Sequence, residues 1–205
     1  MPAFGVLLLP VSMRAAAGDL FEADGGSGAI NKFTPGGTKT VFASGLNGPA
    51  GLAFDGSGNL FASEISTGTI YKFTRTGTKT TFASGLSGPG GLAFDAASNL
   101  FEGDSTGGTI TKITPAGTKT NFASGLNGPG ELAFDSSGNL FEADQFSGSI
   151  YKFTPTGVRT TFASLLQRPI GLALTARAIS LRRTETAGRL TNSLLAEQKL
   201  FLPRG

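Results

Sequence analysis

The side chains that could do chemistry in this 205-residue chain are carboxylates, and they recur at a fixed interval. One set of acids ends a short apolar stretch in each of four units: Asp24, Glu64, Asp104 and Asp144. Carboxylates at such positions can bind a ligand, or they can accept hydrogen bonds from nearby backbone groups. We therefore treat these four as candidate ligand-binding residues at the rim of the fold, with a structural role as the alternative.

A second set of acids consists of Asp55, Asp95 and Asp135. Each is followed by three small residues and then an asparagine. Aspartate in such a run commonly bonds its own turn, so we predict a structural role for this set. Glu131 differs because it breaks the repeat: positions 51, 91 and 171 are all glycine. Functional sites are usually asymmetric, so Glu131 is the candidate catalytic residue, and a tolerated rim substitution is the alternative.

The composition excludes several other chemistries. The 205 residues include no Cys and no His, so they cannot supply a thiol nucleophile, a Ser-His-Asp triad or a Cys/His zinc site. Any bound metal ion would need oxygen ligands. No apolar run approaches the roughly 18 residues that cross a bilayer, so we expect no membrane span.

The formal charge of +3 is unevenly distributed. Residues 1–174 hold 11 basic and 12 acidic side chains, whereas residues 175–205 hold six basic and two acidic ones. The repeated part is therefore close to neutral. We expect its lysines, such as Lys72 and Lys112, to lie on a sheet face of mixed charge, and we expect no nucleic-acid partner.

The elements that must position the acids follow from a repeat of 40 residues, marked by Leu-Phe pairs that begin at positions 20, 60, 100 and 140. The second unit contains apolar stretches at 51–54, 60–64, 69–74 and 79–84, separated by turn residues. Four strands in about 40 residues match one propeller blade, and a solenoid is the alternative. We predict an all-β fold, a β-propeller of about four four-stranded blades.

The repeats occupy residues 18–174, with units that begin near 18, 51, 91 and 131. The first unit starts at its second strand, and residues 169–174 form a lone first strand. That strand either closes a four-bladed ring or leaves an open arc, and we expect an incomplete ring. An arc exposes blade faces and edge strands, so we also expect self-association.

The two ends depart from the repeat. Residues 1–17 combine an apolar stretch with three alanines but lack a basic start, so we predict the remnant of a signal peptide and a secreted or periplasmic protein. A disordered leader is the alternative. Residues 175–205 lose the repeat, yet codons read one base out of frame over 178–184 permit Asn-Leu-Phe-Glu-Ala-Asp. We predict an out-of-frame tail, with an evolved C-terminal helix as the alternative.

The unit resembles a known family. The motif Pro-x-Gly-Leu-Ala-Phe-Asp-x-x-Gly-Asn-Leu-Phe-x-Ala-Asp, present with small changes at 49–64 and 129–144, is similar to the NHL repeat. It resembles more loosely the senescence-marker-protein/gluconolactonase group of six-bladed propellers. In that group an acid near the start of an inner strand helps to hold a divalent cation. The resemblance implies calcium as a candidate cofactor, with Glu131, Asp104 and Asp144 as candidate ligands.

Three functions remain open at this point. We predict a non-catalytic, NHL-like propeller that binds a protein or carbohydrate as an exported scaffold. The first alternative is a metal-dependent, lactonase-like hydrolase in which Glu131 and rim acids hold a cation that polarises the substrate carbonyl. The second alternative is a non-functional product of a damaged gene.

Overall fold

The computed structural model describes residues 18–174 and a strand at 179–183. The predicted leader at 1–17 and the remainder of the predicted tail, at 175–178 and 184–205, lie outside the described residues. Export and the change of reading frame therefore stay predictions. At 179–183, within the segment for which a helix was the alternative, the chain forms a strand.

The described residues form five antiparallel sheets in chain order. The first contains β1 (Leu20–Asp24), β2 (Ala29–Phe33) and β3 (Lys39–Ala43). The second contains β4 (Pro49–Phe54), β5 (Leu60–Glu64), β6 (Thr69–Phe73) and β7 (Lys79–Ala83), with a short 3-10 helix at Ile65–Thr67. The third contains β8 (Pro89–Phe94), β9 (Leu100–Asp104), β10 (Thr109–Ile113) and β11 (Lys119–Ala123). The fourth contains β12 (Pro129–Phe134), β13 (Leu140–Asp144), β14 (Ser149–Phe153) and β15 (Arg159–Ala163), and the fifth contains β16 (Pro169–Leu174) and β17 (Ile179–Arg183).

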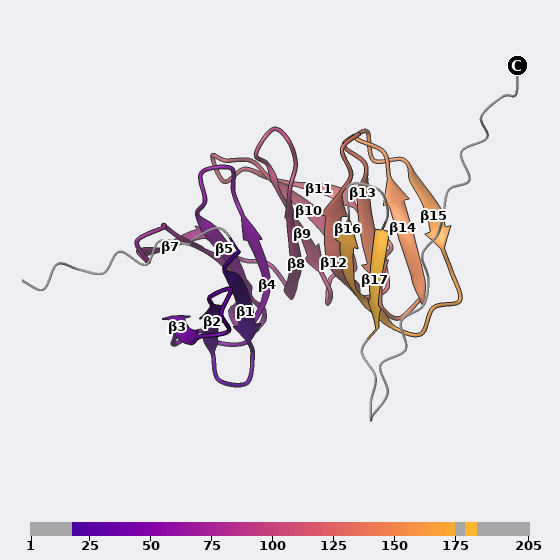
Figure 1. Ribbon diagram of the computed structural model, residues 1–205. Coiled ribbons are helices and arrows are strands. Elements are labelled where there is room, and N and C mark those ends of the chain that lie inside the picture. The colour runs from indigo at the N-terminus through magenta and orange to yellow at the C-terminus, as the bar shows by residue number, and fades with distance from the viewer. Residues whose placement is uncertain (1–17, 175–178, 184–205) are drawn as a thin grey trace, which may run out of the picture.

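Each sheet is one blade, with its strands paired in chain order. The first strands of successive blades, β4, β8, β12 and β16, contact one another, and the later strands of each blade lie progressively farther from this inner row. Figure 1 shows the blades following one another from the indigo β1–β3 sheet to the orange β12–β15 sheet. The predicted β-propeller blades are confirmed, with three complete blades between two partial ones.

The period-two alternation of each strand gives every blade two apolar faces. Leu60 and Phe73 pack with Ile30 of the preceding blade, whereas Phe61 and Ile70 pack with Leu100 of the following blade. Phenylalanines complete the junctions in edge-to-face groups with centroids 4.9–5.2 Å apart. These groups are Phe21, Phe42 and Phe54, then Phe61, Phe82 and Phe94, then Phe101, Phe122 and Phe134.

The ring is open over the described residues. Strand β16 lies beside β12 and pairs with β17, while β1 is an edge strand that pairs with β2 alone. The expected incomplete ring is confirmed, and the option that residues 169–174 close a four-bladed ring is wrong, because β16 remains stacked on the last complete blade. No helix in the described part of the chain is long and apolar enough to cross a membrane.

Candidate functional site: the blade rim and its acids

Three of the four predicted rim acids are buried where the second strand of a blade ends: Glu64, Asp104 and Asp144. Each accepts a backbone N–H from the loop that enters its blade from the preceding one. These bonds join Asn47 to Glu64 at 2.6 Å, Ser87 to Asp104 at 2.9 Å and Asn127 to Asp144 at 2.7 Å. The repeated carboxylates therefore bind the loops that connect one blade to the next.

The other carboxylate oxygen of each acid bonds the turn that follows its strand. Asp104 Oδ1 accepts the N–H groups of Thr106 and Gly107 at 3.1 and 2.6 Å, and Asp144 Oδ1 accepts that of Ser147 at 3.1 Å. Glu64 accepts the hydroxyl of Thr67. Both oxygens of each acid thus have donors inside the fold, and the ligand-binding role of this set stays a prediction.

Asp24, the fourth rim acid, is less buried than its counterparts. It accepts the N–H groups of Gly26 and Ser27 at 3.1 and 3.0 Å. Hydrogen bonds from Ser27, its side chain first, lower the pKa of Asp24. The loop residue equivalent to Asn47 would be residue 7, which lies outside the described part of the chain. Asp24 therefore makes the turn bonds without a described cross-blade bond.

Replacing Asp144 with alanine tests the fastening role. Asp144→Ala removes the buried carboxylate that accepts the N–H groups of Asn127 and Ser147, and we expect a loss of about 2–3 kcal/mol in the free energy of unfolding. The measurement is urea unfolding monitored by circular dichroism. Asp24→Ala is the matched control, with a smaller expected effect because it removes turn bonds alone among the described residues. Equal effects of the two substitutions would contradict the cross-blade role.

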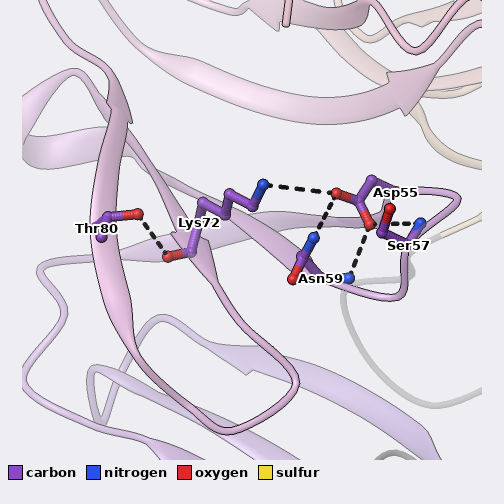
Figure 2. A network of polar contacts seen from close by, with 5 residues as sticks. All are labelled: Asp55, Ser57, Asn59, Lys72 and Thr80. Carbon is purple, nitrogen blue, oxygen red and sulfur yellow. Dashed lines mark hydrogen bonds and ion pairs between the residues drawn. The ribbon is translucent and has the colours of Figure 1, made fainter.

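The Asp55 set bonds its own turns, as predicted. Asp55 Oδ1 accepts the N–H groups of Ser57 and Asn59 at 2.9 and 2.8 Å, and its Oδ2 accepts the Asn59 side-chain amide at 2.7 Å (Figure 2). Burial opposes ionisation, but the hydrogen bonds from Asn59 and Ser57 outweigh it and lower the pKa of Asp55. Lys72 Nζ lies 3.8 Å from Asp55 Oδ2 and 5.4 Å from the centre of the Phe61 ring. The mixed charge expected for this face is thus present.

A hollow of about 280 Å³ lies beside this turn, between two blades. Asp55 and Lys72 form its polar side, and Phe61, Phe82 and Phe94 form its apolar side. The Lys72 ammonium contacts both the Asp55 carboxylate and the Phe61 ring. Among these five lining residues, both charged groups are therefore paired with each other rather than free to bind a ligand.

Glu131 lies in β12, within the irregularity of the β12–β13 pairing between Pro129 and Leu132. Its register position is that of Gly51 and Gly91, where an added Cβ would point at the inner strand of the following blade, so Glu131 faces β16 by the same geometry. Burial raises the pKa of Glu131 to about 7. Within residues 18–174 and 179–183, no three acidic side chains lie close enough to hold a metal ion, so Glu131, Asp104 and Asp144 do not form a joint site there.

Two acids that the sequence reasoning missed are Glu102 and Glu142, in the middle of β9 and β13. Both side chains are fully buried, and none of their carboxyl oxygens has a hydrogen-bond partner in the part of the chain that the structure describes. Burial, reinforced by the charge of the nearby Asp104 or Asp144, raises the pKa of each to about 8. The strand alternation could have found them, because Glu142 shares the inward face of Leu140.

A second missed feature is asymmetric. Phe146 is 57% exposed in the β13–β14 turn, lies over Gly128, and has the Arg168 guanidinium 5.4 Å from its ring centre. At the position of Phe146, the other units have small residues, namely Gly26, Ser66 and Thr106. At the position of Arg168, they have glycine, as at Gly48 and Gly88. Among the described blades, the pair therefore occurs on one rim.

No protein-family model matches the sequence, and no curated protein matches it significantly. Solved structures do match. Virginiamycin B lyase from Staphylococcus aureus has a TM-score of 0.69 at 17% identity, over 82% of this chain and 60% of that one. A chain of a nidogen/laminin complex has a TM-score of 0.73 at 21% identity, over 80% of this chain and 67% of that one. A proposed gluconolactonase has a TM-score of 0.70 at 16% identity, over 80% of this chain and 67% of that one.

These likenesses define the class of fold, a β-propeller. The neighbours include a gluconolactonase-like propeller, as the sequence resemblance predicted. At these identities the likeness establishes the fold alone, and the chain spans about 60% of the lyase's length.

Proposed function

We propose that this chain is a non-catalytic β-propeller scaffold that acts outside the cytoplasm and binds a protein or carbohydrate partner. The observation that carries the proposal is the use of the repeated acids. Glu64, Asp104 and Asp144 each accept a backbone N–H from the loop before their blade and a further hydrogen bond from the turn after their strand, so their recurrence is explained by folding. Their repetition then needs no catalytic explanation.

The comparisons support this choice in two ways. A histidine-to-alanine variant of the S. aureus lyase is catalytically inactive, and the 205 residues of this chain contain no histidine. The same residues therefore cannot repeat that chemistry. Another neighbour belongs to a nidogen/laminin complex, in which a propeller fold takes part in a protein assembly.

The Phe146–Arg168 pair is the contact point that we assign to the partner. An exposed aromatic ring beside a guanidinium can stack on an apolar group or a sugar face while the cation pairs with a carboxylate. Its occurrence on one rim alone gives the asymmetry that selective binding requires.

The competing hydrolase is tested directly with calcium and a sugar lactone. Calorimetric titration with Ca²⁺ and a lactone hydrolysis assay should give the same results for the wild type and for Glu131→Gln, because Glu131 faces β16 without two neighbouring acids. Calcium binding and lactone hydrolysis that are both present in the wild type and lost in Glu131→Gln would overturn the scaffold proposal.

A further inference from the structure

The inner edge of β1 lacks a strand that every complete blade possesses. Strands β5, β9 and β13 each pair on both sides, whereas β1 pairs with β2 alone among the described residues. An unpaired strand edge offers a row of N–H and C=O groups to any strand of matching register. Over the described residues, the first blade is therefore one strand short.

The face of this blade is also uncovered. Leu20 is 64% exposed, while its equivalents Leu60, Leu100 and Leu140 are at most 1% exposed. Among the described residues Asp24 bonds only its own turn, whereas its equivalents also accept an N–H from the loop before an inner strand. Leu20 and Asp24 are thus the counterparts of residues that complete the other junctions, but over the described residues they lack the same contacts.

The chain carries a strand of the missing kind in β16. Its sequence, Pro-Ile-Gly-Leu-Ala-Leu, follows the pattern of β4, β8 and β12, and its third residue is glycine as in β4 and β8. The register between β16 and its present partner β17 differs by one residue from that of the other blades. Leu172 faces Leu181, nine positions on, whereas Leu132 faces Glu142, ten positions on. Strand β17 is therefore a poor substitute for a second blade strand.

The third residue of an inner strand lies close to the backbone of the next inner strand. A Cβ at Gly51 would lie 2.2 Å from the carbonyl oxygen of Gly90, although β12 has Glu131 at the equivalent position. Strand β16 has Gly171 there, as β4 and β8 have Gly51 and Gly91.

We propose that β16 of one copy pairs with β1 of a second copy, replacing β17, so that the two chains complete a four-stranded blade between them. In the register of the other blades, Leu172 then lies opposite Glu22 of the second copy and Leu174 opposite its Leu20. Two copies joined at both ends would contain eight blades, at the upper end of the usual range of about four to eight. The occupant of the open face is thus a second copy of this chain, and this inference does not depend on the proposed partner.

Light scattering after size exclusion tests the association on the full chain. We expect a mass of at least two 20.9 kDa chains for the wild type and a shift to the single-chain mass for Leu20→Asp, which puts a charge on the new junction. Val158→Asp is the matched control, because Val158 is similarly exposed, at 59%, but lies in a turn away from β1. A single-chain mass for the wild type would overturn the proposal.

A cross-link tests the register and the identity of the copies. The chain has no cysteine, so the double variant Glu22→Cys/Leu172→Cys can form only the disulfides that these two positions allow. Under oxidation we expect covalent dimers or larger species, absent from both single variants. A disulfide-bonded single chain would show that the chain's own β16 closes the ring, and the absence of any disulfide would show that these strands do not pair; either result would overturn the proposal.

Discussion

Glu102→Gln and Glu142→Gln are each expected to stabilise the protein at pH 8, by about 2 kcal/mol, because they remove a carboxyl group that ionises freely in the unfolded chain and whose ionisation burial opposes inside a blade junction. Both carboxyls are fully buried, with no hydrogen-bond partner among residues 18–174 and 179–183. Thr111 and Lys119 near Glu102, and the Gly130 backbone and Arg159 near Glu142, lower the two pKa values, but less than burial raises them. Glutamine preserves the shape of the side chain and cannot ionise.

The pH dependence follows from the direction of these shifts. Burial raises the pKa of both glutamates from 4.5 to about 8, so between these values the folded state binds more protons than the unfolded state. Stability must therefore fall as the pH rises from about 5 to 8 and level off above, with a limiting slope of about 1.4 kcal/mol per pH unit for each group. Thermal unfolding at several pH values should show a flatter profile for the double glutamine variant.

Glu22 supplies the matched control for this prediction. It occupies the same strand position, but it is exposed and accepts the Asn31 side-chain amide at 2.8 Å. Glu22→Gln should therefore give no stabilisation at pH 8. A wild-type protein whose stability is constant between about pH 5 and 8 would contradict the burial of the two unpaired carboxyls.

Gly91→Ala is expected to cause the largest loss of stability, about 3 kcal/mol, because the inner strands pack backbone against backbone at this point. An added Cβ would lie 2.4 Å from the Gly130 carbonyl oxygen and 2.7 Å from the Glu131 Cα. Neither atom can move without shifting the whole of β12. Urea unfolding is the measurement.

Gly56→Ala is the control for the inner-strand glycine. Gly56 lies in the β4–β5 turn at a negative φ, with nothing within 4 Å of an added Cβ. Alanine there should leave stability unchanged or raise it slightly, because it restricts the unfolded chain. If the two substitutions had equal effects, the close contact between β8 and β12 could not be a determinant of the fold.

Much of the fold could be predicted because each unit repeats the same short-range signals. Alternating strands, turn aspartates and period-spaced phenylalanines predict blades, and the Asp55 turn follows that expectation bond by bond. The open ring could also be anticipated from the partial first unit. The partner of each lone strand could not be predicted, because pairing between distant segments leaves no local signal in the sequence.

The candidate site was harder to predict. Recurrence drew attention to Glu64, Asp104 and Asp144, but their acceptance of loop N–H groups from across a junction depends on how two blades meet. By residue type alone, Glu102 and Glu142 would be predicted to be exposed. Their burial follows from the strand face that they share with buried leucines. The Phe146–Arg168 pair joins residues from two different loops, so the sequence showed two isolated exceptions to the repeat rather than one contact.

Amide hydrogen exchange by nuclear magnetic resonance tests most directly whether the rim acids build the blade junctions. The structure predicts that the Asn127 amide, bonded to Asp144 Oδ2 at 2.7 Å, is protected in the wild type and in Asp24→Ala, and exchanges much faster in Asp144→Ala. An Asn127 amide that exchanges at the rate of an open loop in the wild type, or whose protection survives in Asp144→Ala, would contradict the structural role of the repeated acids.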